Sequence, residues 1–419
     1  MPEDLIVSAC QPQSVLAQVL LEPEPELEDT LTYDITAWAL PYAYGLKAYA
    51  STQRLDSEKM EEETAYWEEK QKPDTISPYA YLIEWSSMTD ARFLAALLRK
   101  GVKARFANGQ FTIEGQQYEP GTVVITRADN RKMDAGRFNE IMANTARELG
   151  QPLRTVSTGF ADSGFDLGSG SLEFIEKPRV AVLTGEKTSA NSFGEVWYFF
   201  EQCLDYPLFP IKPDQISGIE YSDYNVLVMP EGDYEIDEDG IESLSGWIRR
   251  GGRLIAIGSA LAALEGKEGF SLSKYATEEE EEEAREEREN TSLDRRLDPF
   301  AGQSRRYISQ SIPGAIFKLQ LDTSHPLAYG LDTYYSLKTS SDFYQLLKDT
   351  WNVGYIGEAP EVIGFAGSGA LEDIKNTAVF AVQDKGRGAA IYLVDNPLFR
   401  GFWENGKFLF CNALFFAGQ

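Results

Sequence analysis

The pattern of apolar and polar positions divides the chain into three parts. Residues 1–75 combine short apolar runs with acidic stretches, and the run over 5–22 predicts short strands. Over 76–175, segments with strand-like and helix-like patterns alternate, which is typical of an α/β layer. In the third part, 176–419, the strands between 179 and 257 are uninterrupted apolar runs between helices, as in parallel sheets that are covered on both faces, and the chain after 307 is rich in strands. We therefore expect an α/β protein built on two layers with mainly parallel sheets, each Rossmann-like or flavodoxin-like.

Two segments of the third part depart from this alternation. Residues 272–304 include six consecutive glutamates at 278–283. Like charges four residues apart destabilise a helix by ~0.2–0.5 kcal/mol per pair, so this stretch predicts a mobile, solvated insertion. A docking tail for calcium or for a basic protein is the alternative. The apolar run Phe408–Phe416, near the end of the chain, predicts a buried helix instead.

The net charge of the chain and the length of its apolar runs argue against nucleic-acid and membrane partners. The chain has 419 residues with 66 acidic against 39 basic side chains, a formal charge of −27. Nucleic acids and anionic membranes would be repelled, and the densest basic clusters are only arginine pairs. No run approaches the ~20 apolar residues of a membrane helix, so we expect no membrane span. The acidic start Met1–Asp4 has no apolar signal-peptide region.

Histidine and cysteine counts restrict the chemistry. The three cysteines, Cys10, Cys203 and Cys411, are widely spaced and form no metal-binding or disulfide pattern. The single histidine is His325. A zinc peptidase site with two histidines and a glutamate needs a second imidazole, which this chain does not have. We expect no metal and no cofactor in this chain.

Ser259 and His325 are the candidates for nucleophilic catalysis. Ser259 follows a predicted strand, where a nucleophile elbow would place its nucleophile, but Ile257 and Leu261 stand where that motif has glycines. A helix N-cap explains the serine equally well. His325 would have to be the base of any such site, and its turn sequence also suits a surface hydrogen-bonding role.

A ligand-binding crevice is predicted at the carboxyl ends of the strands, where open α/β sheets bind their ligands. Its candidate lining residues are Gly185, Glu231, Gly258 and Ser259. Nearby, Glu235, Asp237 and Asp239 have the first spacing of a calcium loop, but Gly246 stands where the loop needs its last carboxylate. Capping of the following helix is the simpler interpretation of these acids.

Two blocks resemble a known family. Gln11–Leu16 with Leu31–Gly45 resembles the segment just after the catalytic domain in long bacterial zinc carboxypeptidases of the M14 type. Asp395–Trp403 with Phe408–Phe416 resembles the C-terminus of the same proteins. The resemblance implies that this chain is their C-terminal region without the peptidase domain. Zinc is then expected only in that absent domain, and a secreted or periplasmic location is implied.

Residues 178–419 also resemble class I glutamine-amidotransferase-like domains. The loop at Gly185, the segment Asp223–Gly232 and the strand leading into Gly258 and Ser259 carry this resemblance. Active members have a cysteine at the elbow and a His-x-Glu after a later strand. Here the elbow carries Ser259, and the late strand leads to Asp395-Asn396-Pro397. This domain therefore lacks both the cysteine nucleophile and the histidine base of active members, and acyl transfer needs an activated nucleophile and a base.

These observations leave three functional hypotheses. The first is a non-catalytic accessory region, structural or ligand-binding, that serves an attached or associated peptidase domain. The second is a glutamine-amidotransferase-like hydrolase using Ser259 with His325. The third is a module that binds a sugar or a peptide at the crevice. The expected organisation is an N-terminal segment with an acidic linker (1–75), a small α/β domain (76–175) and the amidotransferase-like domain (176–419).

Overall fold

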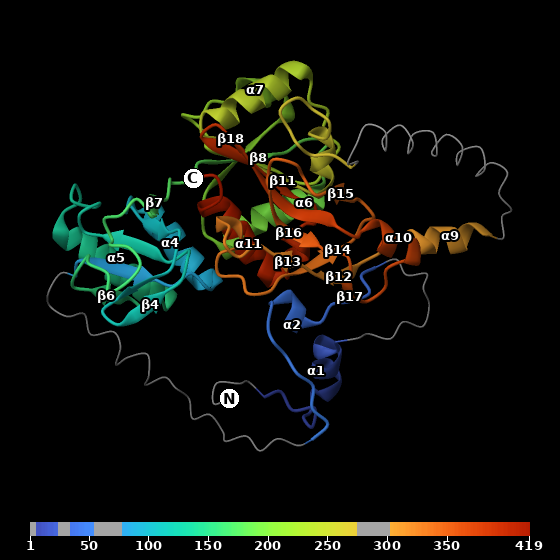
Figure 1. Ribbon diagram of the computed structural model, residues 1–419, viewed down its shortest axis with the longest axis horizontal. Helices are drawn as coiled ribbons and strands as arrows, with labels where there is room; N and C mark the ends of the chain where they lie inside the picture. The colour runs from blue at the N-terminus through green and yellow to red at the C-terminus, as the bar shows by residue number, and fades with distance from the viewer. Residues whose placement is uncertain (1–5, 24–33, 54–77, 275–301) are drawn as a thin grey trace.

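The computed structural model describes residues 6–23, 34–53, 78–274 and 302–419. It is a mixed α/β structure with several sheets, some of them with parallel strands. A smaller unit with α4 and α5 lies beside the larger unit that contains the main sheet (Figure 1). The predicted acidic linker and most of the predicted insertion 272–304 lie outside the described residues. No helix in the described ranges is both long and apolar enough to cross a bilayer.

The smaller unit differs from the prediction, because its sheet is antiparallel. The strand order is β6-β1-β5-β2-β7, and every neighbouring pair runs antiparallel. This unit is therefore not a Rossmann-like layer. Helices α4 (Met88–Arg99) and α5 (Ala135–Leu149) and a hairpin of β3 and β4 complete it. The strands are β1 Ala80–Ile83, β2 Arg105–Ala107, β3 Phe111–Ile113, β4 Gln116–Tyr118, β5 Val123–Thr126, β6 Arg154–Val156 and β7 Leu172–Phe174.

The main sheet has the order β13-β16-β18-β19-β11-β10-β8-β9, with β15 beside β18. Its five strands from β19 to β9 are parallel, as predicted, and the strands beyond β19 are antiparallel. The parallel strands are β8 Val180–Leu183, β9 Leu208–Ile211, β10 Val226–Met229, β11 Arg253–Ile257 and β19 Gly388–Leu393. The antiparallel strands are β13 Gln320–Leu321, β15 Tyr344–Gln345, β16 Trp351–Ile356 and β18 Thr377–Lys385.

Both faces of the parallel strands β8, β10, β11 and β19 are covered, which explains their uninterrupted apolar sequence. Alternate residues of β8 illustrate this: Val180 and Val182 join one core cluster, whereas Ala181 and Leu183 join another. Helix α7 (Glu238–Arg249) covers the second cluster. The first cluster contains residues of α6 (Ala190–Tyr198), of α11 (Glu404–Phe415) and of the smaller unit, so one continuous core joins the two units.

A third sheet and several short helices complete the larger unit. The third sheet has the order β14-β12-β17 and is antiparallel. Helix α1 corrects the prediction for 5–22, where we expected short strands. The elements are β12 Ala315–Lys318, β14 Tyr335–Lys338, β17 Glu361–Ile363, α1 Ser14–Leu21, α2 Leu40–Ala43, α9 Gln303–Ser309, α10 Ser368–Asp373, the π-helix η1 Phe199–Cys203, and the 3₁₀ helices η2 Pro213–Gly218, η3 Gly258–Ala263, η5 Pro326–Ala328 and η6 Phe399–Gly401.

Asn412 is the polar centre of the contact between the two units. It lies in α11, which confirms the buried helix predicted at the end of the chain, and its side chain is fully buried. The indole N–H of Trp85 donates to its Oδ1 at 2.6 Å. Its Nδ2 donates to the carbonyl oxygens of Leu327 at 2.9 Å and Tyr329 at 2.8 Å. One amide therefore satisfies three buried groups from two distant parts of the chain.

We predict that Asn412→Leu strongly destabilises the protein. The change leaves the Trp85 N–H and the Leu327 and Tyr329 carbonyls buried without this partner, at about 1–3 kcal/mol for each unsatisfied group. Urea unfolding should show a loss of more than about 3 kcal/mol. Asn144→Leu is the matched control, because the Asn144 side chain only accepts a bond from exposed Arg147; it should change stability by less than about 1 kcal/mol.

Candidate functional site

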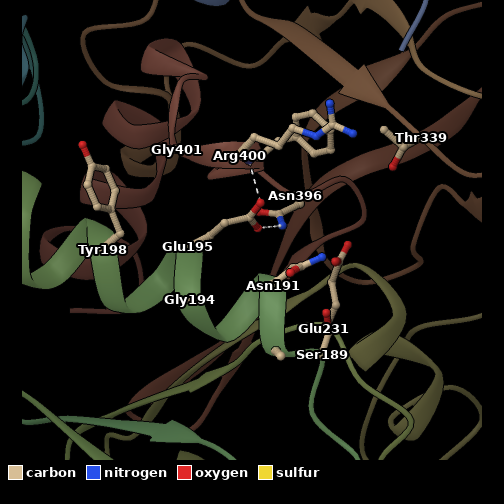
Figure 2. Close-up of a pocket in the computed structure, with 12 residues that line it drawn as sticks. Ser189, Asn191, Gly194, Glu195, Tyr198, Glu231, Thr339, Asn396, Arg400 and Gly401 are labelled. Carbon is tan, nitrogen blue, oxygen red and sulfur yellow. Dashed lines mark hydrogen bonds between the residues drawn. The ribbon is translucent and has the colours of Figure 1, made fainter. Parts of the chain in front are cut away.

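The main sheet contains a topological switch point between β8 and β10. From β8 the chain goes to β9 on one side, and it then returns to β10 on the other side of β8. Connections that leave neighbouring strands in opposite directions open a crevice at the carboxyl ends, where α/β proteins bind ligands. The structure has a pocket of about 680 Å³ at this place. Its walls come from α6, from the loops that follow β10, β14 and β19, and from η6 (Figure 2).

Glu231, one of the predicted crevice residues, lies in this pocket. Its backbone is held by the start of α6: the Glu231 N–H donates to Ser192 Oγ at 3.0 Å, and its carbonyl accepts from the Ser189 N–H at 2.8 Å. Gly258 makes room for its side chain. A Cβ on Gly258 would lie 2.5 Å from Glu231 Oε1, and Gly258 has a φ of +54°. Glycine adopts that backbone conformation without the steric cost that a side chain adds.

Glu195 is the second carboxylate of the pocket, and it is rigidly positioned. Its Oε2 accepts a hydrogen bond from Asn396 Nδ2 at 2.6 Å. Its Oε1 accepts from the backbone N–H of Arg400, also at 2.6 Å, and both bonds are visible in Figure 2. Arg400 has a φ of +48°, an uncommon conformation for a residue with a side chain. The loop after β19 thus fixes a carboxylate that belongs to α6.

A buried ion pair lies beside the pocket. Lys338 Nζ contacts Asp395 Oδ1 at 2.9 Å, and Ser336 Oγ donates to Asp395 Oδ2 at 2.7 Å. The side chains of Lys338 and Asp395 are 2% and 6% exposed. The pair joins β14 of the third sheet to the loop after β19, so the third sheet becomes a wall of the pocket at Thr339. Removing one partner of such a pair would leave an uncompensated buried charge.

Burial makes both pocket carboxylates weaker acids than usual. The pKa of Glu231 is raised to about 7, first by burial and then by the negative charges of Glu195 and Asp395, while a hydrogen bond from Asn396 opposes the shift. Burial also raises the pKa of Glu195, against the hydrogen bonds from the Arg400 backbone and Asn396 and the charge of Arg400. A carboxyl group with a pKa near 7 exchanges its proton at neutral pH.

The other predicted crevice residues lie around the pocket but do not line it. Gly185 lies in the loop after β8, with an exposed backbone and a φ of +152°. Ser259 lies in the turn after β11, as expected, but at the first turn of the 3₁₀ helix η3 rather than of an α-helix. Its Oγ accepts from the Gly232 N–H at 3.0 Å and donates to the Gly232 carbonyl at 3.2 Å. The hydroxyl therefore ties the loops after β10 and β11 together.

His325 does not meet Ser259. It follows β13, four strands away from β11, so the two positions are separated by about 19 Å across the sheet. Since β13 runs antiparallel to β11, the two residues also follow opposite edges. His325 Nδ1 accepts the Leu327 N–H at 3.0 Å and caps η5, and burial lowers its pKa. The structure does not assemble the predicted catalytic pair.

The acids with calcium-loop spacing have structural roles. Asp237 is the N-cap of α7, and its carboxylate accepts the Gly240 N–H at 2.9 Å. Glu235 forms an exposed ion pair with Lys187 at 3.2 Å. Capping, the simpler interpretation in the sequence, is confirmed for Asp237. Within the described ranges, no group of three or more potential ligand side chains could hold a metal ion.

Sequence reasoning missed Glu195, Asn396 and Arg400 as site residues. Asn396 lies close to the end of β19, as Glu231 lies close to the end of β10, so the criterion that indicated Glu231 applies to it as well. It was noted only as a departure from the histidine of active amidotransferases. Glu195 gave no local signal, because a glutamate in an amphipathic helix is usually solvated.

Comparisons with known proteins do not establish a family. No family model and no curated protein matches the chain. Among solved structures, a ThuA-like protein from Bacteroides uniformis is similar over 56% of this chain and 90% of its own, with 14% identity and a TM-score of 0.32. A ThuA-like protein from Parabacteroides merdae covers 54% of this chain and 88% of its own, with 12% identity and a TM-score of 0.32. A β-galactosidase from Bacillus circulans covers 68% and 35%, with 13% identity and a TM-score of 0.30. Similarities this weak assign no function.

Ser259→Ala should act on stability and not on any chemistry. The variant loses both hydrogen bonds to Gly232, and since the residue is exposed, we expect a loss of about 0.5–1.5 kcal/mol in thermal or urea unfolding. Fluorophosphonate should not label the wild-type protein at this residue, since no base activates the hydroxyl. Stoichiometric labelling of Ser259 would contradict this assignment and restore the hydrolase hypothesis.

Glu231 should make the protein less stable as the pH rises. The folded state binds the proton more tightly than the unfolded state, whose pKa is near 4.5, so the free energy of unfolding falls between pH 4.5 and about 7. At 1.36 kcal/mol for each pKa unit, this group contributes a loss of about 2–3 kcal/mol between pH 5 and 8. In urea unfolding at pH 5 and pH 8, the Glu231→Gln variant should not show this loss of stability, whereas the control Glu186→Gln, at an exposed position, should show it as the wild type does. Parallel pH profiles for wild type and Glu231→Gln would contradict the assignment.

Proposed function

We propose that this chain is an accessory, ligand-binding region and that its pocket at the β8/β10 switch point holds the ligand. The observation that carries the proposal is the pair Glu231 and Glu195, held by backbone and side-chain contacts in an open pocket with both polar and apolar lining. Fixed hydrogen-bonding groups in a concave site are the usual features of small-ligand recognition. The ligand that suits this lining is a peptide end or a sugar, since both offer several hydrogen-bond donors to carboxylate and amide oxygens.

Binding is a better account of this site than amide hydrolysis by Ser259. An amidotransferase-like hydrolase needs a nucleophile and a base in hydrogen-bond reach. Here the Ser259 hydroxyl bonds to the Gly232 backbone, and His325 follows the opposite edge of the sheet. The parallel sheet, the Gly258-Ser259 turn and the segment ending at Gly232 support a glutamine-amidotransferase-like fold in which the elbow has taken a structural role.

The resemblance of the two terminal blocks supports a context for this pocket. Both blocks are similar to the C-terminal region of M14-type zinc carboxypeptidases, and the second block includes Asn396 and Arg400 of the pocket wall. We therefore place the ligand-binding region beside an attached or associated peptidase domain, in an exported protein, where it would hold a part of that domain's substrate. Zinc would belong to the peptidase domain.

Blocking the pocket tests the proposal. Gly194 lines the pocket from α6, and a Cβ at this position would have no atom within 4 Å, so Gly194→Trp places an indole there without a backbone clash. A panel of neutral monosaccharides and dipeptides should contain members that raise the unfolding temperature of the wild type, by mass action. Gly194→Trp should abolish that increase, and Gly168→Trp, at an equally open glycine in the smaller unit, should preserve it. An increase that survives in Gly194→Trp places the ligand elsewhere and overturns the proposal.

A further inference from the structure

We infer that the pocket binds a positively charged group, the ammonium or guanidinium of a basic peptide, between Glu195 and Glu231. The inference deepens the proposed function and rests on it. The inference depends on the ion pairs in and around the pocket: the nearby cations are paired with other acids, whereas Glu195 and Glu231 have no cationic partner among the residues that the structure describes. A ligand with a positive charge would supply that partner.

The cations near the pocket are committed to other acids. Lys338 forms its buried pair with Asp395. The Arg400 guanidinium pairs with Asp34 at 2.8 Å and lies over the Phe399 ring at 4.9 Å; its charge acts on Glu195 only as a minor influence. No ion pair of Glu195 or Glu231 occurs in the described part of the chain.

Neighbouring hydrogen bonds do not supply the missing charge. Glu195 receives one amide N–H from Asn396 and one backbone N–H from Arg400, which are neutral donors. The groups that face Glu231 from the surrounding elements are Glu195 of α6, Asp395 and Asn396 after β19, and Gly258 after β11. Two are acids and two are neutral. A buried carboxylate in this setting gains most from a cation that forms charge-assisted hydrogen bonds with it.

The pocket also suits the remainder of a basic side chain. Tyr198 and Phe399 line it together with the carboxylates, so an aliphatic stem can lie on aromatic carbon while its charged end reaches the acids. The pocket of about 680 Å³ is open to solvent, which leaves room for the peptide backbone. The formal charge of −27 would attract a cationic ligand to the protein from a distance.

Calorimetric titration with three probes tests the inference. Nα-acetyl-lysine amide carries the ammonium, Nα-acetyl-norleucine amide has nearly the same shape without it, and methyl glucoside is a neutral sugar. We expect the lysine probe to bind most tightly and to bind less tightly at high salt. Its affinity should rise about tenfold from pH 6 to pH 8, because Glu231 must lose its proton, with a pKa of about 7, before it can pair with the cation. Buffers of different ionisation enthalpy should reveal the released proton.

Matched variants locate the effect. Glu231→Gln should remove the pH dependence and weaken the lysine probe at pH 8. Glu195→Gln should also weaken the lysine probe, and it should move the pH dependence to lower pH, because the charge of Glu195 raises the pKa of Glu231. Glu186→Gln, which removes an exposed charge outside the pocket lining, should bind as the wild type does. Unfolding temperatures of the unliganded variants confirm that each is folded.

The outcomes separate this inference from the function on which it rests. Binding of methyl glucoside with no binding of the lysine probe overturns the cationic ligand and leaves a binding pocket. Equal affinity for the lysine and norleucine probes also overturns the cationic ligand, because the charge then contributes nothing. A lysine probe that binds equally well to Glu231→Gln at both pH values places the cation elsewhere. Absence of binding for all three probes at millimolar concentration, and for the wider panel, overturns the proposed function as well.

Discussion

The structure depends on how one buried amide holds helix α11 in place. Asn412 bonds to Trp85 of the smaller unit and to two carbonyls of the η5 turn, within the apolar second half of the helix. A polar group at that depth is tolerated only when its hydrogen bonds are made, so the amide fixes the rotation and the position of the helix. The apolar residues around it could pack in several similar ways, whereas three directed bonds permit one.

The position of α11 in turn determines the site. Gly406, in its first turn, lies so close to the chain before it that a Cβ would be 1.9 Å from the Pro397 carbonyl oxygen. The helix therefore holds the segment after β19 by direct backbone contact. That segment supplies Asn396 and the Arg400 N–H, which orient Glu195 from α6. The contact between the two units at Asn412 therefore helps to position Glu195, because α11 holds the loop after β19 and that loop orients the carboxylate.

The sequence predicted the parts of this arrangement that depend on local pattern. Uninterrupted apolar strands correctly predicted the parallel strands β8, β10 and β11. The end of β10 also pointed to Glu231, which lies in the pocket, whereas Gly258 lies against the Glu231 side chain and does not line the pocket. In the smaller unit the alternation of strand-like and helix-like segments did not give the strand direction: β1 and β5 are fully buried, yet they pair antiparallel. Burial on both faces does not specify strand direction, which long-range pairing sets. The role of Glu195 in the pocket could not be predicted for a related reason. Its hydrogen-bond partner Asn396 is 201 residues away in the sequence, and local sequence patterns do not show contacts between such distant residues.

The cost of Glu231 to the fold is the strongest argument that its position serves a ligand. Its burial next to Glu195 and Asp395 stabilises the protonated form, so at neutral pH and above the folded state carries a poorly solvated charge. The carboxylate also requires glycine at position 258, because a side chain there would collide with Glu231 and the backbone has a positive φ. Lys338 and Asp395 show that the same region can neutralise a buried acid when only structure is required. The loops after β10 and β11 thus lower the stability of the folded state, whereas the neighbouring Lys338–Asp395 pair neutralises its buried charges. Such a local loss of stability is expected where a residue is selected for binding and not for folding.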